Sequence, residues 1–173
     1  MRFHPLDPEF TRNWRRYARQ SGLAAIALTA AIWSADVVSG LPVARAVLVA
    51  SIGSTAFVLF ITPHSPYATP RHAVGGHAIA FAVSAPFALA AENLSGGFTA
   101  GIAPWAVGYS AVAVGVAMLV MAAFKAQHPP AAGTVLAVVA QGFDWVLVSF
   151  LAIAVLVLTG IHVALRRSMI DLF

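Results

Sequence analysis

The sequence contains no cysteine and very few charged residues, and both absences narrow the kinds of protein that it can encode. Without cysteine there is no disulfide framework, no thiolate metal site and no cysteine nucleophile. Charged residues make up 9% of the 173 residues, whereas soluble domains carry about 25%. With 60% hydrophobic residues and a mean hydropathy of +0.85, the chain has too few polar side chains to cover an aqueous surface. This composition argues against a soluble globular protein and against a disordered one.

Several functional classes also lack their motifs. The ten Lys and Arg residues give a formal net charge of +4, but they are dispersed along the chain, so we expect no nucleic-acid partner. The sequence has no phosphate-binding loop, no GxSxG motif and no paired carboxylates. We therefore expect a protein that is not an enzyme and that has no cofactor and no metal site.

Long apolar stretches divide the chain. A helix of about 20 consecutive apolar residues crosses the roughly 30 Å of hydrocarbon in a bilayer. We predict an all-α polytopic membrane bundle with four or five spanning helices and one short or broken helix. The expected segments are residues 22–40, 43–62, 70–91, 101–124, 131–141 and 145–165. Residues 131–141 reach about half a crossing at about 1.5 Å per residue, and Gly142, Phe143 and Asp144 separate them from the last span.

The distribution of Lys and Arg predicts the orientation. If both termini are cytoplasmic and the segments alternate, nine of the ten Lys and Arg residues fall inside and only Arg45 falls outside. The nine are Arg2, Arg12, Arg15, Arg16, Arg19, Arg71, Lys125, Arg166 and Arg167. We therefore expect a multi-pass protein of the bacterial inner (plasma) membrane with both termini in the cytoplasm.

The first 20 residues read as a separate element. Phe10, Trp14 and Tyr17 recur at helical spacing with arginines between them, a pattern typical of a basic amphipathic helix on the inner leaflet. We divide the chain into this interfacial helix, residues 1–20, and a transmembrane domain, residues 21–173. Docking of a partner protein is the alternative role for the first element.

Two loops rich in proline and histidine carry the chemistry. TPHSPYATPRHAVGGH spans residues 62–77, and KAQHPPAAGT spans residues 125–134. Thr69 and Pro70 form a helix start, and Arg71 and His72 then occupy its first turn, where cations are unfavourable unless an anion binds the free N–H groups. The second loop starts a helix in the same way. The candidate anion-binding residues are His64, Ser65, Thr69, Arg71, His72, Lys125, His128, Pro129 and Pro130.

Simpler interpretations of these residues stay open. Arg71 and Lys125 also fit ordinary residues of the positive inner face, and His64, His77 and His162 also fit interfacial hydrogen-bonding groups. Metal binding is disfavoured, because the two histidines of the first helix are five residues apart and no carboxylate is expected on the same face of the membrane.

Small and polar residues mark two further helix faces. Gly101, Gly108 and Gly115 recur every seven residues and predict a close-packing seam between helices or between subunits. Ser51, Ser54 and Thr55 lie at helical spacing, where they either line a pathway or bond a neighbouring helix. A homo-oligomer is expected, because a few short segments enclose a pathway poorly on their own.

The strings SPYATPRHAVGGH and AQHPPAAGT resemble the HPP family of integral membrane proteins, which is named for the motif at His128, Pro129 and Pro130. The resemblance covers roughly residues 20–165. At Thr69 and His72 the chain departs from the Gln and Asn that often flank the Pro-Arg pair in the family. Plant and cyanobacterial members are associated with nitrite transport.

The resemblance and the loop chemistry together predict passage of a small inorganic anion, with nitrite as the leading candidate, by a channel or a facilitated mechanism. The expected partners are the lipid bilayer, a small anion and further copies of the chain. A non-transporting membrane sensor or assembly protein, and a transporter of another small solute, are the alternatives.

Overall fold

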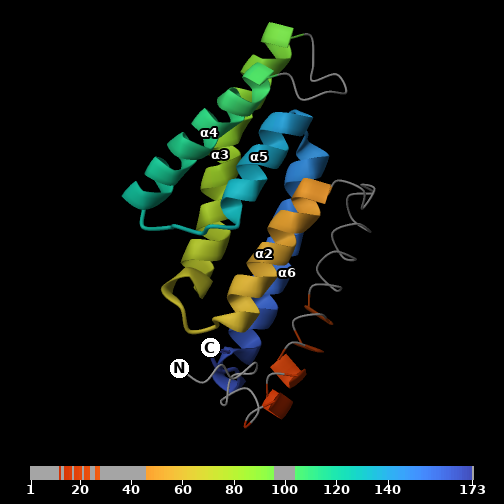
Figure 1. Ribbon diagram of the computed structural model, residues 1–173, viewed down its shortest axis with the longest axis vertical. Coiled ribbons are helices and arrows are strands. Elements are labelled where there is room, and N and C mark those ends of the chain that lie inside the picture. The colour runs from red at the N-terminus through yellow and green to blue at the C-terminus, as the bar shows by residue number, and fades with distance from the viewer. Residues whose placement is uncertain are drawn as a thin grey trace, which may run out of the picture.

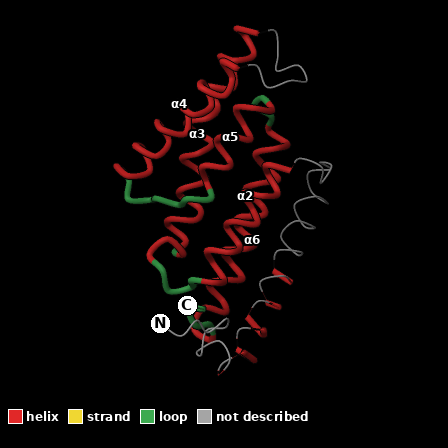
Figure 2. The backbone as a smooth tube through the Cα atoms, in the orientation of Figure 1, coloured by secondary structure: helices red, strands yellow, loops and turns green. Residues whose placement is uncertain are grey.

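Helices make up nearly all of the computed structural model (Figure 1; Figure 2), which describes residues 46–95 and 104–172 together with 12, 14–16, 18–20, 22–23 and 26–27. In chain order the α-helices with described bounds are α2 (Ala46–Ile61), α3 (Pro70–Ser95), α4 (Pro104–Ala123), α5 (Ala131–Gln141) and α6 (Trp145–Leu165). The short 3-10 helices η1 (Pro66–Ala68) and η2 (Arg166–Ser168) follow α2 and α6. The described residues between 12 and 27 are also helical, and none of the described residues forms a strand. The prediction of an all-α bundle is confirmed.

The helix boundaries follow from a few residues. Thr69 has extended backbone angles (φ −82°, ψ 153°) and precedes Pro70 at the start of α3, the position where proline fits a helix best. The helix α5 ends at Gly142, whose φ of +85° lies in the left-handed region that favours glycine. The carboxylate of Asp144 then accepts a hydrogen bond from the Val146 N–H at 2.9 Å and caps α6. The predicted division of the last apolar block at residues 142–144 is therefore confirmed.

The helices differ in how much of a bilayer they span. Among the described residues, Pro70–Asn93 and Trp145–Ser168 are long and apolar enough to cross a membrane, and Leu48–Ile61, Tyr109–Ala123 and Ala131–Gln141 are shorter apolar helices. At about 1.5 Å per residue, α5 is roughly 16 Å long, about half of the hydrocarbon thickness. The predicted short helix before the last span is thus present with the expected boundaries.

The short helix α5 occupies the centre of the bundle. Figure 1 shows it between the pair α3 and α4 and the pair α2 and α6, and it packs against α2, α3 and α4. Its buried residues join two apolar clusters, one with α2, α3 and α6 and one with α3 and α4. Because both of its sides are covered by other helices, the Thr134 hydroxyl of α5 is removed from solvent.

The C-terminal tail and the end of α2 meet at one end of the bundle. The Leu172 N–H donates to the Ile61 carbonyl at 2.9 Å, and the amide of Gln20 donates to the carbonyls of Phe60 and Ile170 at 2.6 Å each. The Arg166 side chain donates to the Pro63 carbonyl at 3.1 Å. This end, which also holds the turn between α2 and α3, is the lower end in Figure 1.

Candidate functional site

The His-Pro-Pro turn is buried deep in the bundle. Lys125 lies two residues after the end of α4 and has a φ of +50°, and residues 126–130 then run across α3 to the start of α5 (Figure 1). The His128 side chain is only 1% exposed, and its Nδ1 lies 3.1 Å from the Tyr67 carbonyl oxygen. Because a carbonyl only accepts, Nδ1 carries the proton and donates.

Two glycines of α3 allow this turn to approach. A Cβ at position 76 would lie 2.6 Å from the His128 Cβ and 3.1 Å from the Ala126 carbonyl oxygen. At the neighbouring Gly75 it would meet the Ala126 Cβ at 3.5 Å, an ordinary contact. The two motifs, Gly-Gly-His and His-Pro-Pro, therefore pack directly on each other.

A cluster of imidazoles and hydroxyls joins α2, α3, α5 and the turn. His77 Nε2 lies 3.0 Å from Thr55 Oγ1, and His77 Nδ1 lies 2.8 Å from Thr134 Oγ1. Thr134 Oγ1 lies 3.0 Å from Ser51 Oγ, which donates to the Pro130 carbonyl at 2.9 Å. His128 Nε2 lies 3.4 Å from Thr55 Oγ1. The centroids of the His77 and His128 rings are 5.4 Å apart. All five side chains are buried. We call this group, Ser51, Thr55, His77, His128 and Thr134, the hydroxyl–imidazole cluster.

Close packing brings α5 to this cluster. A Cβ at Gly133 would lie 3.2 Å from the Ser51 Cβ, so the absence of a side chain lets α5 approach α2 until the hydroxyls of Ser51 and Thr134 meet. The polar residues expected on α2 thus divide by role. Ser51 and Thr55 bond neighbouring elements, whereas the exposed Ser54 donates to Ala50 of its own helix at 2.8 Å.

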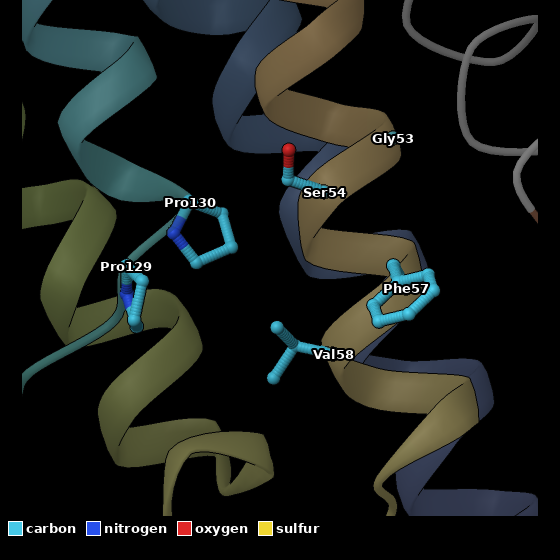
Figure 3. Close-up of a pocket in the computed structure, with 6 residues that line it drawn as sticks. All are labelled: Gly53, Ser54, Phe57, Val58, Pro129 and Pro130. Atoms are coloured by element: carbon cyan, nitrogen blue, oxygen red, sulfur yellow. The ribbon is translucent and has the colours of Figure 1, made fainter. Parts of the chain in front are cut away.

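A pocket lies beside the turn. Its volume is about 540 Å³, and Figure 3 shows Pro129 and Pro130 on one side and the α2 residues Gly53, Ser54, Phe57 and Val58 on the other. Phe57 is 61% exposed, so the pocket opens at the side of the bundle. None of the lining residues in the described part of the chain is charged. We call this the α2–turn pocket.

A second, more apolar pocket of about 360 Å³ lies between α4, the turn and the start of α5. Met118, Met121, His128 and Pro129 are among its lining residues. The turn therefore has a pocket on each side, and Pro129 borders both.

Arg71 lies close to the turn but borders neither pocket. Its side chain is exposed, and its Nη2 donates to the Phe124 carbonyl at 2.8 Å, at the end of α4. A guanidinium at this position satisfies a carbonyl that the helix end leaves free and faces the negative end of the helix dipole. The arginine thus links the start of α3 to the chain that enters the turn, and exposed Lys125 lies in that same connection.

The remaining candidates on the first loop bond to their surroundings. Thr69 Oγ1 lies 2.7 Å from His72 Nδ1, and Ser65 Oγ accepts from the Tyr67 N–H at 3.2 Å. His64 Nδ1 lies 3.6 Å from a carboxylate oxygen of Asp171, which also accepts from the His64 N–H at 3.0 Å. The expectation that this end lacks a carboxylate is therefore wrong, because the C-terminal tail folds back against the first loop.

The backbone amides at the two helix starts are engaged by the chain itself. Ala131, Ala132 and Gly133 donate to the carbonyls of residues 128, 129 and 130 at 2.9, 3.1 and 3.0 Å. At α3, the His72 and Ala73 amides both donate to the Thr69 carbonyl, at 3.0 and 2.9 Å. The prediction that such N–H groups are free for an anion is wrong for these five. The positive end of the α5 dipole still faces the turn.

The other expected features are placed as follows. Gly115 lies on an exposed face of α4 where a Cβ would meet nothing within 4 Å, so it makes no close contact inside the bundle. Gly108 lies on α4, and Gly101 lies outside the described residues. His162, in the last turn of α6, is buried in the bundle, and its Nδ1 donates to the Leu59 carbonyl at 2.7 Å. Within the described ranges no group of three His, Cys, Asp or Glu residues is placed to hold a metal ion.

Of the cluster, the sequence interpretation assigned only His128 to the site; Ser51 and Thr55 were left between a pathway and a helix contact, and His77 and Thr134 were not assigned to it. Both carry polar atoms inside otherwise apolar helices, and polar residues at such positions are a recognised signal of function in membrane proteins. The glycine pair before His77 was the further signal, since it allows the backbone of another segment to approach.

An all-α bundle of apolar helices around a buried polar cluster defines an integral membrane protein. The family model described as HPP, transmembrane region, matches residues 11–170, and the chain belongs to the HPP family of transmembrane proteins. The match includes both motifs and the five α-helices whose bounds are given above. No curated protein and no solved structure matches the chain.

Proposed function

We propose that this chain carries a small inorganic anion across the membrane, with nitrite as the leading candidate, by a channel or a facilitated mechanism. The α2–turn pocket is the binding position in this account. Pro129 and Pro130 form one wall, and the exposed hydroxyl of Ser54 lies in the other.

One observation carries the proposal: the pocket lies at the start of a short central helix. Because α5 is only about half a bilayer long, its N-terminal end lies inside the bundle and not at a membrane surface. Discontinuous helices that direct their positive ends at a substrate are a recurrent feature of membrane transporters. In a site with no charged lining residue, the α5 dipole favours an anion over a cation.

The charges of the described residues support the proposed orientation. Arg71 and Arg166 lie near the turn between α2 and α3, and Arg19 donates to the Ser168 carbonyl at 3.4 Å. Asp144 lies at the other end of the bundle, before α6 (Figure 1). By the positive-inside rule, the end with the arginines faces the cytoplasm. We propose a bacterial inner-membrane protein with both termini inside.

We also propose that the chain works as a homo-oligomer. The α2–turn pocket opens at the side of the bundle, where the described residues of one copy offer no wall. The exposed face of α4 has no side chain at Gly115 and carries the exposed apolar residues Val112 and Leu119, which together give a second copy a surface to approach. A monomeric mass for active protein in mild detergent contradicts this part of the proposal.

The test of the proposed function is flux into proteoliposomes that contain the purified full chain. Uptake of nitrite, nitrate, formate and chloride is compared with uptake into protein-free vesicles of the same lipid. We expect protein-dependent nitrite uptake that exceeds chloride uptake. The absence of uptake for all four anions contradicts the proposal and favours a non-transporting sensor or assembly role.

A further inference from the structure

The hydroxyl–imidazole cluster has more hydrogen-bond contacts than its neutral side chains have protons. His128 Nδ1 donates to the Tyr67 carbonyl, which leaves Nε2 of the neutral ring as an acceptor. Ser51 gives its single hydroxyl proton to the Pro130 carbonyl. The contact of 3.0 Å between Ser51 and Thr134 then needs the proton of Thr134.

The shortage falls on Thr55. If Thr134 donates to Ser51, His77 Nδ1 must donate to Thr134 across 2.8 Å, and the neutral ring has no proton left for Nε2. The one hydroxyl proton of Thr55 is then needed by three acceptors, namely the Ser51 carbonyl at 3.0 Å, His77 Nε2 at 3.0 Å and His128 Nε2 at 3.4 Å. A second proton on His77, at Nε2, reduces this shortage because His77 then donates to Thr55, and the Thr55 proton is left with two acceptors, the Ser51 carbonyl and His128 Nε2.

The same geometry gives an added proton a route between the two rings. Thr55 Oγ1 lies between His77 Nε2 and His128 Nε2. Thr55 accepts the proton of His77 Nε2 and releases its own hydroxyl proton to His128 Nε2. The number of protons on Thr55 is unchanged, and the positive charge moves from the His77 ring to the His128 ring.

The groups around His77 supply no fixed charge that competes with this proton. The helices α2 and α5 face it with the hydroxyls of Thr55 and Thr134, and the turn faces it with His128. His72 on α3, bonded to Thr69, is the next titratable group toward the turn. A lasting positive charge among these neutral groups is costly unless an anion accompanies it.

An anion bound in the α2–turn pocket needs a positive charge to compensate its own. An anion in a pocket without charged lining residues also lacks compensation. The bonds from Pro130 to Ser51, from Ser51 to Thr134 and from Thr134 to His77 connect the pocket wall to the imidazole. Proton and anion therefore favour each other's binding, and by linkage the effect is reciprocal.

We propose that His77 and His128 bind one proton as the anion enters the α2–turn pocket, and that proton and anion cross the membrane together in the same direction. This inference rests on the proposed anion transport and specifies how it is coupled. The permeating pair carries no net charge, so the passage is facilitated and electroneutral. His77 and His128 are the proton-binding residues, and Thr55 positions the proton between them.

The experiment compares two driving forces on nitrite uptake into proteoliposomes of the full chain. A potassium diffusion potential set with valinomycin drives a lone anion but not a neutral pair, whereas a pH gradient drives the pair. Uptake into protein-free vesicles is subtracted, since undissociated acid crosses lipid alone. We expect protein-dependent uptake that rises at least fivefold with an inward proton gradient and changes less than twofold with the potential.

Two variants locate the effect in the cluster. Thr55→Val keeps the shape of the side chain but removes the hydroxyl. We expect this variant to lower the uptake driven by the proton gradient at least tenfold. Thr55→Ser keeps the hydroxyl, and we expect uptake within about threefold of the wild type. Equal gradient-driven uptake by folded Thr55→Val and wild type overturns the inference.

The wild-type measurement also separates this inference from the proposed function. Nitrite uptake that follows the potential and ignores the pH gradient overturns proton coupling and leaves anion transport standing. Absence of uptake for every anion removes both.

Discussion

Gly76 of α3 and His128 of the turn lie so close together that a methyl group at position 76 would come within 2.6 Å of the His128 Cβ. Real Cβ atoms do not approach this closely. The atom in the way is the Cβ of His128, which is buried and held next to its own backbone. The glycine therefore sets the depth of the His-Pro-Pro turn in the bundle. The position of the His-Pro-Pro turn then fixes the distance from His128 to Thr55 and the width of the α2–turn pocket.

This contact predicts different effects for two neighbouring substitutions. We expect Gly76→Ala to lower the free energy of unfolding by about 1–3 kcal/mol, because the turn must move. Gly75→Ala is the control, since its added Cβ makes only an ordinary contact at 3.5 Å, and alanine in a helix gains up to about 1 kcal/mol over glycine. Thermal unfolding in detergent compares the two, and equal stability contradicts the proposed role of Gly76.

The buried hydroxyl of Ser51 gives a second prediction. Ser51→Ala removes the side-chain donor to the Pro130 carbonyl, which keeps the Gly133 N–H, and leaves Thr134 without its partner on α2, so we expect a loss of about 1–3 kcal/mol in stability. Ser54→Ala is matched in chemistry but removes only an exposed bond within α2, and we expect a change below about 0.5 kcal/mol. A Ser51→Ala protein as stable as Ser54→Ala shows that the cluster does not hold α2 to α5.

The fold could largely be predicted because its signals are local. The boundaries of α5 and α6 depend on Gly142 and Asp144, whose backbone angle and capping bond are properties of a few neighbouring residues. The start of α3 depends in the same way on Thr69 and Pro70. Such signals do not require knowledge of which helices are neighbours.

The site could be predicted only in part because it depends on packing. His128 was assigned from its motif, but its contacts with Tyr67 and Thr55 join segments more than 60 residues apart. Arg71 was expected to bind an anion with free amides, yet it bonds to the Phe124 carbonyl. The sequence cannot show that this carbonyl is near, because that depends on how α4 packs beside α3.

Arg71 provides a third prediction. Replacement by alanine removes the bond to the Phe124 carbonyl and a positive charge near the turn, so we expect nitrite flux to fall severalfold with a modest loss of stability. We expect Arg71→Lys to be intermediate, because an ammonium keeps the charge but lacks the planar fork of the guanidinium. Arg167→Ala, which removes an equal charge from exposed η2, serves as the control in the same flux assay. Wild-type flux in Arg71→Ala contradicts a role in transport.

The proposed orientation in the membrane gives a fourth prediction. Because the chain has no cysteine, a single cysteine at Arg2 or at Leu172 is the only thiol in each variant. We expect both to react with a membrane-impermeant maleimide only after the cells are opened. Labelling of either variant in intact cells places that terminus outside and contradicts the proposed topology.

If the anion passes through the α2–turn pocket, a side chain that fills this pocket must block transport, and two glycines test this. Gly53 lines the pocket and Gly160 lies on the exposed face of α6, and at both positions a Cβ would meet nothing within 4 Å. Leucine therefore fits at either position without a clash of its Cβ. Only at position 53 does it fill the pocket.

The decisive measurement is protein-dependent nitrite flux into proteoliposomes that contain folded Gly53→Leu or Gly160→Leu. The account predicts flux reduced at least tenfold by Gly53→Leu and flux within about twofold of the wild type for Gly160→Leu. Wild-type flux through Gly53→Leu, with the same fold and the same oligomeric mass, would contradict it.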